Sequence, residues 1–286
     1  MTELTELRSA DAYCLYLTRR HYENFSVVSV FLPRDIRTHL ARVYAFCRTT
    51  DDYGDESGPD AAFALARLDR WRSELNECFE DRPTPIHPVL IALSETIQAC
   101  RMPRQPFLDL IQANVQDQTV HRYQSWEDLR GYCMLSAASV GRLVLRVFGI
   151  DDPMADSLSD DVCIGLQLAN HAQDVKRDGL KGRSYLLDEI VAAAGARAGV
   201  RDLCDRADSL LRSGIALERM VPSRLRLQLA LYRLGGQEVV RSTRELGYRT
   251  DLSRPVVSKW RKIRLAARAV GRSMTTIGHA TPQGVA

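Results

Sequence analysis

The sequence lacks several features that would set it apart from ordinary globular proteins. It has no run of about 18 apolar residues, so no transmembrane helix is predicted. Its first residues are polar and include acids, unlike a signal peptide. Glycine (17) and proline (11) are too few among 286 residues for a collagen-like or disordered chain. These absences predict a soluble globular protein, long enough to bury a sizeable core.

Paired cysteine motifs and a strong charge of one sign are also missing. The seven cysteines are odd in number and form no CxxC pair. Most lie within apolar helical patterns, so we expect buried thiols in a reducing compartment, which makes the protein cytoplasmic. The net charge of +3 is too small to indicate nucleic-acid binding by itself. We therefore expect no nucleic-acid partner.

Helical periodicity dominates, whereas strict alternation of apolar and polar residues is scarce. No linker or repeat divides the chain, so we predict an all-α protein of a single domain, residues 1–286, with its core at about residues 11–270. Pro33 suits the start of a helix that continues to Thr50. The other predicted helices cover residues 60–80, 89–100, 105–123, 125–148, 154–177, 198–213, 224–232, 237–246 and 256–270.

The first of two acidic segments contains Asp51, Asp52 and Asp55. Asp51 and Asp55 are spaced i, i+4, so they share one face of a helix with Asp52 close by. They fall at the predicted C-terminal end, where the helix macrodipole disfavours anions. A bound cation would relieve this repulsion, and magnesium prefers carboxylate oxygens together with substrate phosphate. Taken alone, such a segment is also common at solvated helix ends.

The second acidic segment places Asn170, Asp174 and Asp178 at i, i+4 and i+8, again on one helical face, with His171 pointing away. Each segment follows apolar residues of its own helix. Carboxylates beside an apolar cavity indicate a diphosphate held by metal above a hydrocarbon chain. Polar residues that flank these segments supply countercharge and hydrogen bonds: Arg48, Gln167, Gln173, Lys176, Arg177, Lys181, Arg183 and Tyr185.

Five ordered motifs resemble those of the squalene/phytoene synthase family. They cover residues 21–25 with 32–34, 44–56, 132–144, 166–178 and 182–186, and the likeness extends over about residues 13–270. Within the family, the chain is most similar to the hopanoid-pathway squalene synthases of the C type, the hydroxysqualene synthases. The resemblance implies an isoprenoid synthase helical bundle around a central apolar cavity.

The resemblance also implies roles for individual residues. The implied catalytic residues are Asp51, Asp52, Asp55, Asp174 and Asp178. Together with Asn170 they are the implied ligands of Mg²⁺, or alternatively of Mn²⁺. The implied substrate-binding residues are His21, Tyr22, Asn24, Arg48, Tyr132, Gln167, Asn170, Arg183 and Tyr185.

Two reactions are consistent with this ligand set. In the first, presqualene diphosphate is ionised and rearranged, and capture of water gives hydroxysqualene; no NADPH is needed, and the chain has no glycine-rich dinucleotide fingerprint. In the alternative, two farnesyl or geranylgeranyl diphosphates condense head to head to presqualene diphosphate, squalene or phytoene. Tyr22 and Asn24 replace serines of many relatives, which favours the first reaction. Leu187 and Ala138-Ser139, where proline and Asn-Pro are usual, leave the subgroup open.

The C-terminal region allows two further interpretations. Residues 245–260 could form a helix-turn-helix that reads DNA, with Arg254 and Lys259 facing phosphates. The basic amphipathic stretch 256–270 could instead rest on an anionic membrane, giving peripheral contact at the inner membrane surface. A solvated outer helix is the plainer interpretation of the same stretch. The expected partners are an isoprenoid diphosphate substrate and other enzymes of the squalene and hopanoid pathway.

Overall fold

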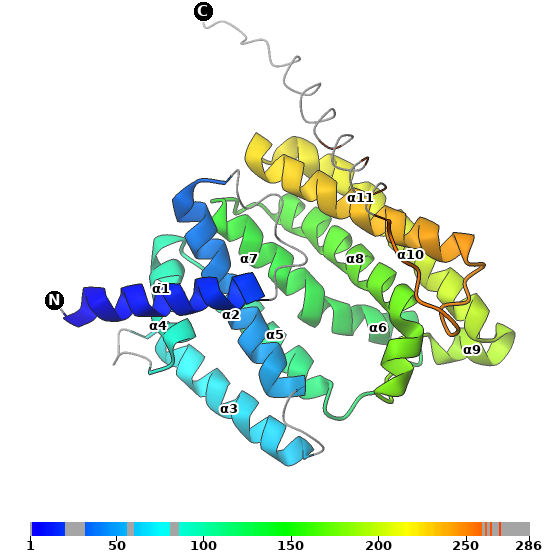
Figure 1. Cartoon of the computed structure of the whole chain (residues 1–286), viewed down its shortest axis with the longest axis horizontal. Helices are drawn as coiled ribbons and strands as arrows, with labels where there is room; N and C mark the ends of the chain where they lie inside the picture. Colours follow the sequence, from blue (N-terminus) through cyan, green and yellow to red (C-terminus); the bar gives the residue numbers. More distant parts are fainter. Residues whose placement is uncertain are drawn as a thin grey trace, which may run out of the picture. The chain divides into compact units, whose positions relative to one another are not determined.

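The computed structural model describes residues 2–20, 32–55, 60–80 and 86–258, together with residues 261, 264 and 269 (Figure 1). The regular elements within these ranges are helices, and β pairing there amounts to an isolated bridge between Tyr123 and Leu187. The all-α prediction is confirmed. The chain forms two compact units: Met1–His121 with Glu127–Asp156, and Arg122–Trp126 with Ser157–Ala286. The single domain and its central cavity stay predictions.

The first unit is built around one central helix, α2 (Arg34–Asp55). The other helices of this unit are α1 (Thr2–Arg20), α3 (Ala61–Glu77), α4 (Pro88–Ala99), α5 (Gln105–Gln116), α6 (Trp126–Cys133) and α7 (Ser139–Val147). Helix α2 contacts α1, α3, α4, α5 and α7. Its Phe46 stacks on Trp71 at 5.5 Å between ring centroids and meets the ring of Phe107 edge-on at 5.1 Å. The first acidic motif therefore lies at the end of a helix that packs against several others of this unit.

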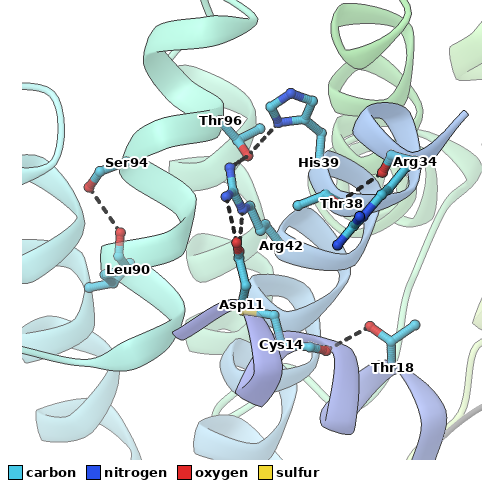
Figure 2. Close-up of polar contacts among 10 residues, drawn as sticks. All are labelled: Asp11, Cys14, Thr18, Arg34, Thr38, His39, Arg42, Leu90, Ser94 and Thr96. Carbon is cyan, nitrogen blue, oxygen red and sulfur yellow. Dashed lines mark hydrogen bonds and ion pairs between the residues drawn. The ribbon is translucent and has the colours of Figure 1, made fainter. Parts of the chain in front are cut away.

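A buried polar network ties α2 to α1 and α4 (Figure 2). Arg42 is 6% exposed and donates to both carboxylate oxygens of Asp11, at 2.7 and 3.0 Å. It also donates to the Thr96 hydroxyl at 3.4 Å, and Nδ1 of His39 lies 2.9 Å from the same oxygen. Because a buried charge left without its partner is strongly destabilising, this network fixes the position of α2.

Two predicted helices of the first unit are shorter or less regular than expected. Helix α5 ends at Gln116 instead of residue 123, because the apolar periodicity stops after Val115 and the chain turns at residues 117–119. The predicted helix 125–148 is interrupted by a π-helical turn, Met134–Ala138. The Ser136 and Ser139 hydroxyls bond back to carbonyl oxygens one turn earlier, at 3.0 and 2.5 Å. Such π turns often occur at functional sites.

The second unit contains α8 (Pro153–Leu180), α9 (Asp188–Ala194), α10 (Ala196–Met220) and α11 (Ser223–Glu245). Helices α10 and α11 lie side by side (Figure 1). A buried ion pair joins them, Arg233 Nε to Glu218 Oε1 at 2.6 Å. The two helices predicted at 224–232 and 237–246 form one continuous helix, α11. Gly236 within it packs closely against α8 and α10, because a Cβ there would lie 2.8 Å from Leu166 and 3.0 Å from Leu211.

The segment after α11 differs from both helical interpretations of the C-terminal region. Residues 253–258 are not helical, so the predicted helix 256–270 does not begin at Val256. A helix-turn-helix needs its second helix close behind the first, and none forms over these residues. Over the described part of the chain, none of the helices is both long and apolar enough to cross a membrane.

Candidate functional site

The first acidic motif occupies the last turn of α2. Asp51, Asp52 and Asp55 follow one another on this turn, as the spacing predicted. Arg48, one turn earlier, forms an ion pair with Asp52 in which both side chains are about one quarter exposed. The helix thus supplies part of the countercharge for its own acidic end.

Helix α5 holds the motif from the side. Asn114 is 9% exposed, and its Nδ2 donates to Asp51 Oδ1 at 3.2 Å and to the Leu110 carbonyl at 3.1 Å. Gln118 Nε2 donates to the Gly54 carbonyl at 3.1 Å, which satisfies a carbonyl at the end of α2. Sequence reasoning missed both amides. The available signal was Asn114 on the apolar face of an otherwise well-patterned helix.

Gly54, within the motif, makes this approach of α5 possible. A Cβ at this position would lie 2.5 Å from Asn114 Oδ1 and 3.2 Å from its Cγ. The first distance is shorter than real Cβ contacts and the second is unusually tight, and Asn114 is held by its two hydrogen bonds. The glycine is therefore needed for the amide to reach Asp51.

The electrostatic state of Asp51 reflects its neighbours. Surrounding protein atoms displace water from this carboxylate, which disfavours the charged form and raises its pKa above the usual range. The Asn114 hydrogen bond lowers the pKa, and the Asp55 carboxylate raises it. Water still reaches the exposed side chain, so solvent screening moderates the shift. A cation near Asp51 would favour the charged form.

Tyr132 also receives a defined place in the first unit. It is 5% exposed, and its hydroxyl donates to Asp117 Oδ2 at 3.0 Å. Asp117 belongs to the turn that follows α5, the helix that carries Asn114. A predicted substrate-binding tyrosine is thus held in one orientation beside the supports of the first motif.

The second acidic motif lies on α8, and this helix is irregular at the middle residue of the motif, Asp174. Asp174 has φ −103° and ψ 15°, so two helical segments meet there. Asn170 is exposed, whereas Gln167, Asp174 and Asp178 are partly buried. The predicted spacing i, i+4, i+8 therefore describes two helical segments that meet at the middle acid.

A segment far along the chain holds Asp174. Arg254 donates from Nε to Oδ1 and from Nη2 to Oδ2 of Asp174, the latter at 3.3 Å. Its Nη2 is also 3.3 Å from Oε1 of the buried Gln173. Gln173 Nε2 in turn donates to the Pro255 carbonyl at 2.8 Å. Sequence reasoning named Arg254 only in the alternative of a DNA-reading helix, and it missed this pairing.

Asp178 and Arg183 are brought together where α8 ends. The backbone amides of Lys181 and Arg183 donate to the Asp178 carbonyl at 2.9 and 3.0 Å, and Gly182 adopts φ +73° in the turn. Burial raises the pKa of the Asp178 carboxylate to about 6, and the Asp174 carboxylate adds to this. Arg177, Lys181 and Arg183 oppose the rise.

Tyr185 lies in a stack of rings. It is 9% exposed, 3.6 Å from the ring of His171 and 5.8 Å from that of Tyr123, measured between centroids. Burial lowers the pKa of His171 to about 3, so this ring is neutral. His171 is buried, at 7% exposed. Among the predicted substrate-binding residues, His21, Tyr22 and Asn24 lie outside the described residues.

The donors of the two motifs suit a hard divalent cation. Asp51, Asp52 and Asp55 offer carboxylates in the first unit, and Asp174, Asp178 and the Asn170 amide offer oxygens in the second. Carboxylate and amide oxygens are the ligands of Mg²⁺ and Mn²⁺. Within the ranges that the structure covers, no three His, Cys, Asp or Glu side chains form a group that could hold a metal ion. The fit is thus one of donor chemistry.

Comparison with known proteins gives a consistent result. The family described as squalene/phytoene synthase matches residues 18–261. A protein named hydroxysqualene synthase from Rhodopseudomonas palustris is 33% identical over 213 residues, which are 74% of this chain and 68% of that protein. Phytoene synthase 3, chloroplastic, from Zea mays is 32% identical over 224 residues, 74% of this chain and 51% of that protein. The chain therefore spans only about half of the maize protein.

A solved structure shares both fold and sequence with this chain. It is the squalene synthase HpnC from Alicyclobacillus acidocaldarius, 45% identical, with a TM-score of 0.79. The match covers 85% of this chain and 96% of that one.

Proposed function

Because the chain belongs to the squalene/phytoene synthase family, we propose that it is a magnesium-dependent hydroxysqualene synthase. Enzymes of this family carry out head-to-head prenyl chemistry on isoprenoid diphosphates and depend on divalent metal ions. The proposed reaction converts presqualene diphosphate and water into hydroxysqualene and diphosphate. The observation that carries the proposal is the 33% identity to a protein named hydroxysqualene synthase over 74% of the chain. The 45% identity to a solved squalene synthase supports the chemistry of the family.

The acidic motifs support the metal-dependent part of the proposal. Magnesium, when bound, would neutralise the charge that develops on the leaving diphosphate. The chain would provide its oxygen ligands from Asp51, Asp52 and Asp55 on α2, and from Asn170, Asp174 and Asp178 on α8. Asn114 would keep Asp51 in place, and Asp117 would orient Tyr132.

The bond changes of the proposed reaction balance without a reductant. The bond between carbon and the diphosphate oxygen breaks, and the electron pair leaves with the diphosphate. The carbocation rearranges while the proposed apolar cavity keeps stray water away. One water then forms the new carbon–oxygen bond and loses a proton to solvent. No nicotinamide takes part in this sequence.

A condensing reaction is the second candidate. It is supported by the 32% identity to a maize protein named phytoene synthase. In this reaction two farnesyl or geranylgeranyl diphosphates would join head to head, with the same acidic residues as ligands. The two candidates differ in substrate, so product analysis separates them.

The test supplies purified protein and Mg²⁺ with presqualene diphosphate or with farnesyl or geranylgeranyl diphosphate, and identifies the products by mass spectrometry. In ¹⁸O-labelled water, we expect hydroxysqualene from presqualene diphosphate with ¹⁸O in its hydroxyl. Chelation of the metal, Asp52→Ala and Asp174→Ala should each suppress it. Coupled products from farnesyl or geranylgeranyl diphosphate would establish the condensing reaction. Turnover of none of these substrates would contradict both candidates.

A further inference from the structure

The segment Arg249–Ser258, which we call the strap, lies against the second acidic motif through three side-chain contacts. Arg254 donates to both carboxylate oxygens of Asp174. Gln173 donates to the Pro255 carbonyl at 2.8 Å, and Lys176 Nζ donates to the Leu252 carbonyl at 3.2 Å. All these residues belong to the second unit. The strap is thus attached to α8 on both sides of Asp174.

These contacts have different chemistry. The Gln173 and Lys176 contacts reach main-chain carbonyls of the strap and do not use the acidic side chains. The Arg254 contact uses both carboxylate oxygens of Asp174, the same atoms that a metal would need. Its side chain is 55% exposed, whereas that of Asp174 is 17% exposed. The guanidinium can therefore swing into solvent while Asp174 stays in place.

We propose that Arg254 is a positioning residue that holds Asp174 as a counter-cation in the metal-free chain and is displaced when a divalent cation binds Asp174. This inference rests on the proposed function, because it takes Asp174 to be a metal ligand. Two cations beside one carboxylate repel each other, so Arg254 and the metal compete. Binding effects are reciprocal: the factor by which Arg254 weakens metal binding is the factor by which metal weakens the Arg254 contact. Gln173 and Lys176 keep the strap attached after Arg254 leaves.

The first test measures Mn²⁺ affinity from the free-ion electron paramagnetic resonance signal, at about 0.15 M salt to screen distant charges. Arg254→Gln should bind Mn²⁺ about 2- to 5-fold more tightly than the wild type, the range expected for loss of a partly exposed ion pair. Arg249→Gln is the matched control. It removes the same charge from an exposed position on the same strap, and its affinity should stay within about 2-fold of the wild type. Arg254→Lys keeps the charge and should stay close to the wild type.

The second test measures deuterium exchange of residues 249–258 with and without Mg²⁺. Exchange in the strap of the wild type should increase with Mg²⁺, whereas in Arg254→Gln it should start higher and change less. Equal Mn²⁺ affinity of the Arg254→Gln and Arg249→Gln variants, or weaker binding by the former, would overturn the proposal. Asp174→Asn separates the assumptions: if it binds Mn²⁺ as the wild type does, the proposed ligand itself is wrong.

Discussion

The two acidic motifs are held in different ways. On α2, Asp51 receives a hydrogen bond from Asn114, a neutral amide on a helix packed in the same core. On α8, Asp174 forms an ion pair with the guanidinium of Arg254, which lies on a non-helical segment eighty residues away. A neutral donor orients a carboxylate without opposing a cation, whereas a guanidinium competes with it. On the proposed roles, a metal could bind Asp51 without displacing a cation from it, whereas at Asp174 it would replace Arg254. Asp52 of the first motif also has a guanidinium partner, Arg48.

The largest expected effect comes from removing a carboxylate of either motif. Asp52→Asn and Asp174→Asn should each lower the rate of diphosphate ionisation about 10²–10³-fold, because each removes a charge that stabilises the leaving group through the metal. Steady-state kinetics with saturating Mg²⁺ measures this. Asp69→Asn, on the exposed surface of α3, is the charge-matched control and should keep wild-type activity. Near wild-type activity of either variant would contradict the proposal that both motifs supply metal ligands for the leaving diphosphate.

A smaller effect is expected when the support of the first motif is removed. Asn114→Ala leaves Asp51 in place and takes away the amide that orients it. Supports of metal ligands typically contribute about 10- to 100-fold to metal affinity or activity. Mn²⁺ titration and kcat/KM should both change in Asn114→Ala, whereas Gln112→Ala, on the exposed face of the same helix, should change neither. Loss of Asn114 should therefore weaken Mn²⁺ binding, whereas loss of Arg254 should strengthen it.

The contrast also explains how much the sequence revealed. Both acidic motifs, Arg48 beside Asp52 and the all-α class follow from spacing and periodicity, which are local properties. Asn114 and Arg254 act across 63 and 80 residues, and no local pattern identifies such partners. The kink at Asp174 and the continuous helix through Gly236 depend on packing with other segments, so tertiary contacts overrode the local signals there.

Gly54→Ala tests whether the close approach of α5 is what prepares the first motif. The added Cβ would displace Asn114 from Asp51, and overpacking of this kind costs about 1–3 kcal/mol of folding stability. Urea unfolding measures the change. Gly179→Ala on α8 is the matched control: its Cβ would meet no atom within 4 Å, so this variant should be as stable as the wild type or slightly more stable. Equal stabilities of the two variants would show that α5 yields easily and that Gly54 serves another purpose.

The smallest effect concerns the other end of α2, where His39 joins the Arg42 network. Burial, and then the Arg42 charge, lowers the pKa of His39 in the folded protein, while Asp35 and Asp11 oppose this. Below the unfolded-state pKa of about 6.5, the unfolded chain takes up a proton that the folded chain resists. The contribution of a neutral His39 to stability is therefore complete above about pH 6.5 and is lost as the pH falls.

His39→Asn should remove this pH dependence. Between pH 7.5 and 5.5 the free energy of unfolding should fall more in the wild type than in the variant, by less than about 1 kcal/mol, because His39 is partly exposed and solvent weakens the shift. Urea titrations at pH 7.5, 6.5 and 5.5 give the difference, and other titrating groups cancel in it. Deuterium exchange at pH 5.5 should locate the loss on α2. Equal pH dependence in both proteins would mean that Arg42 and Asp11 anchor this helix without the histidine.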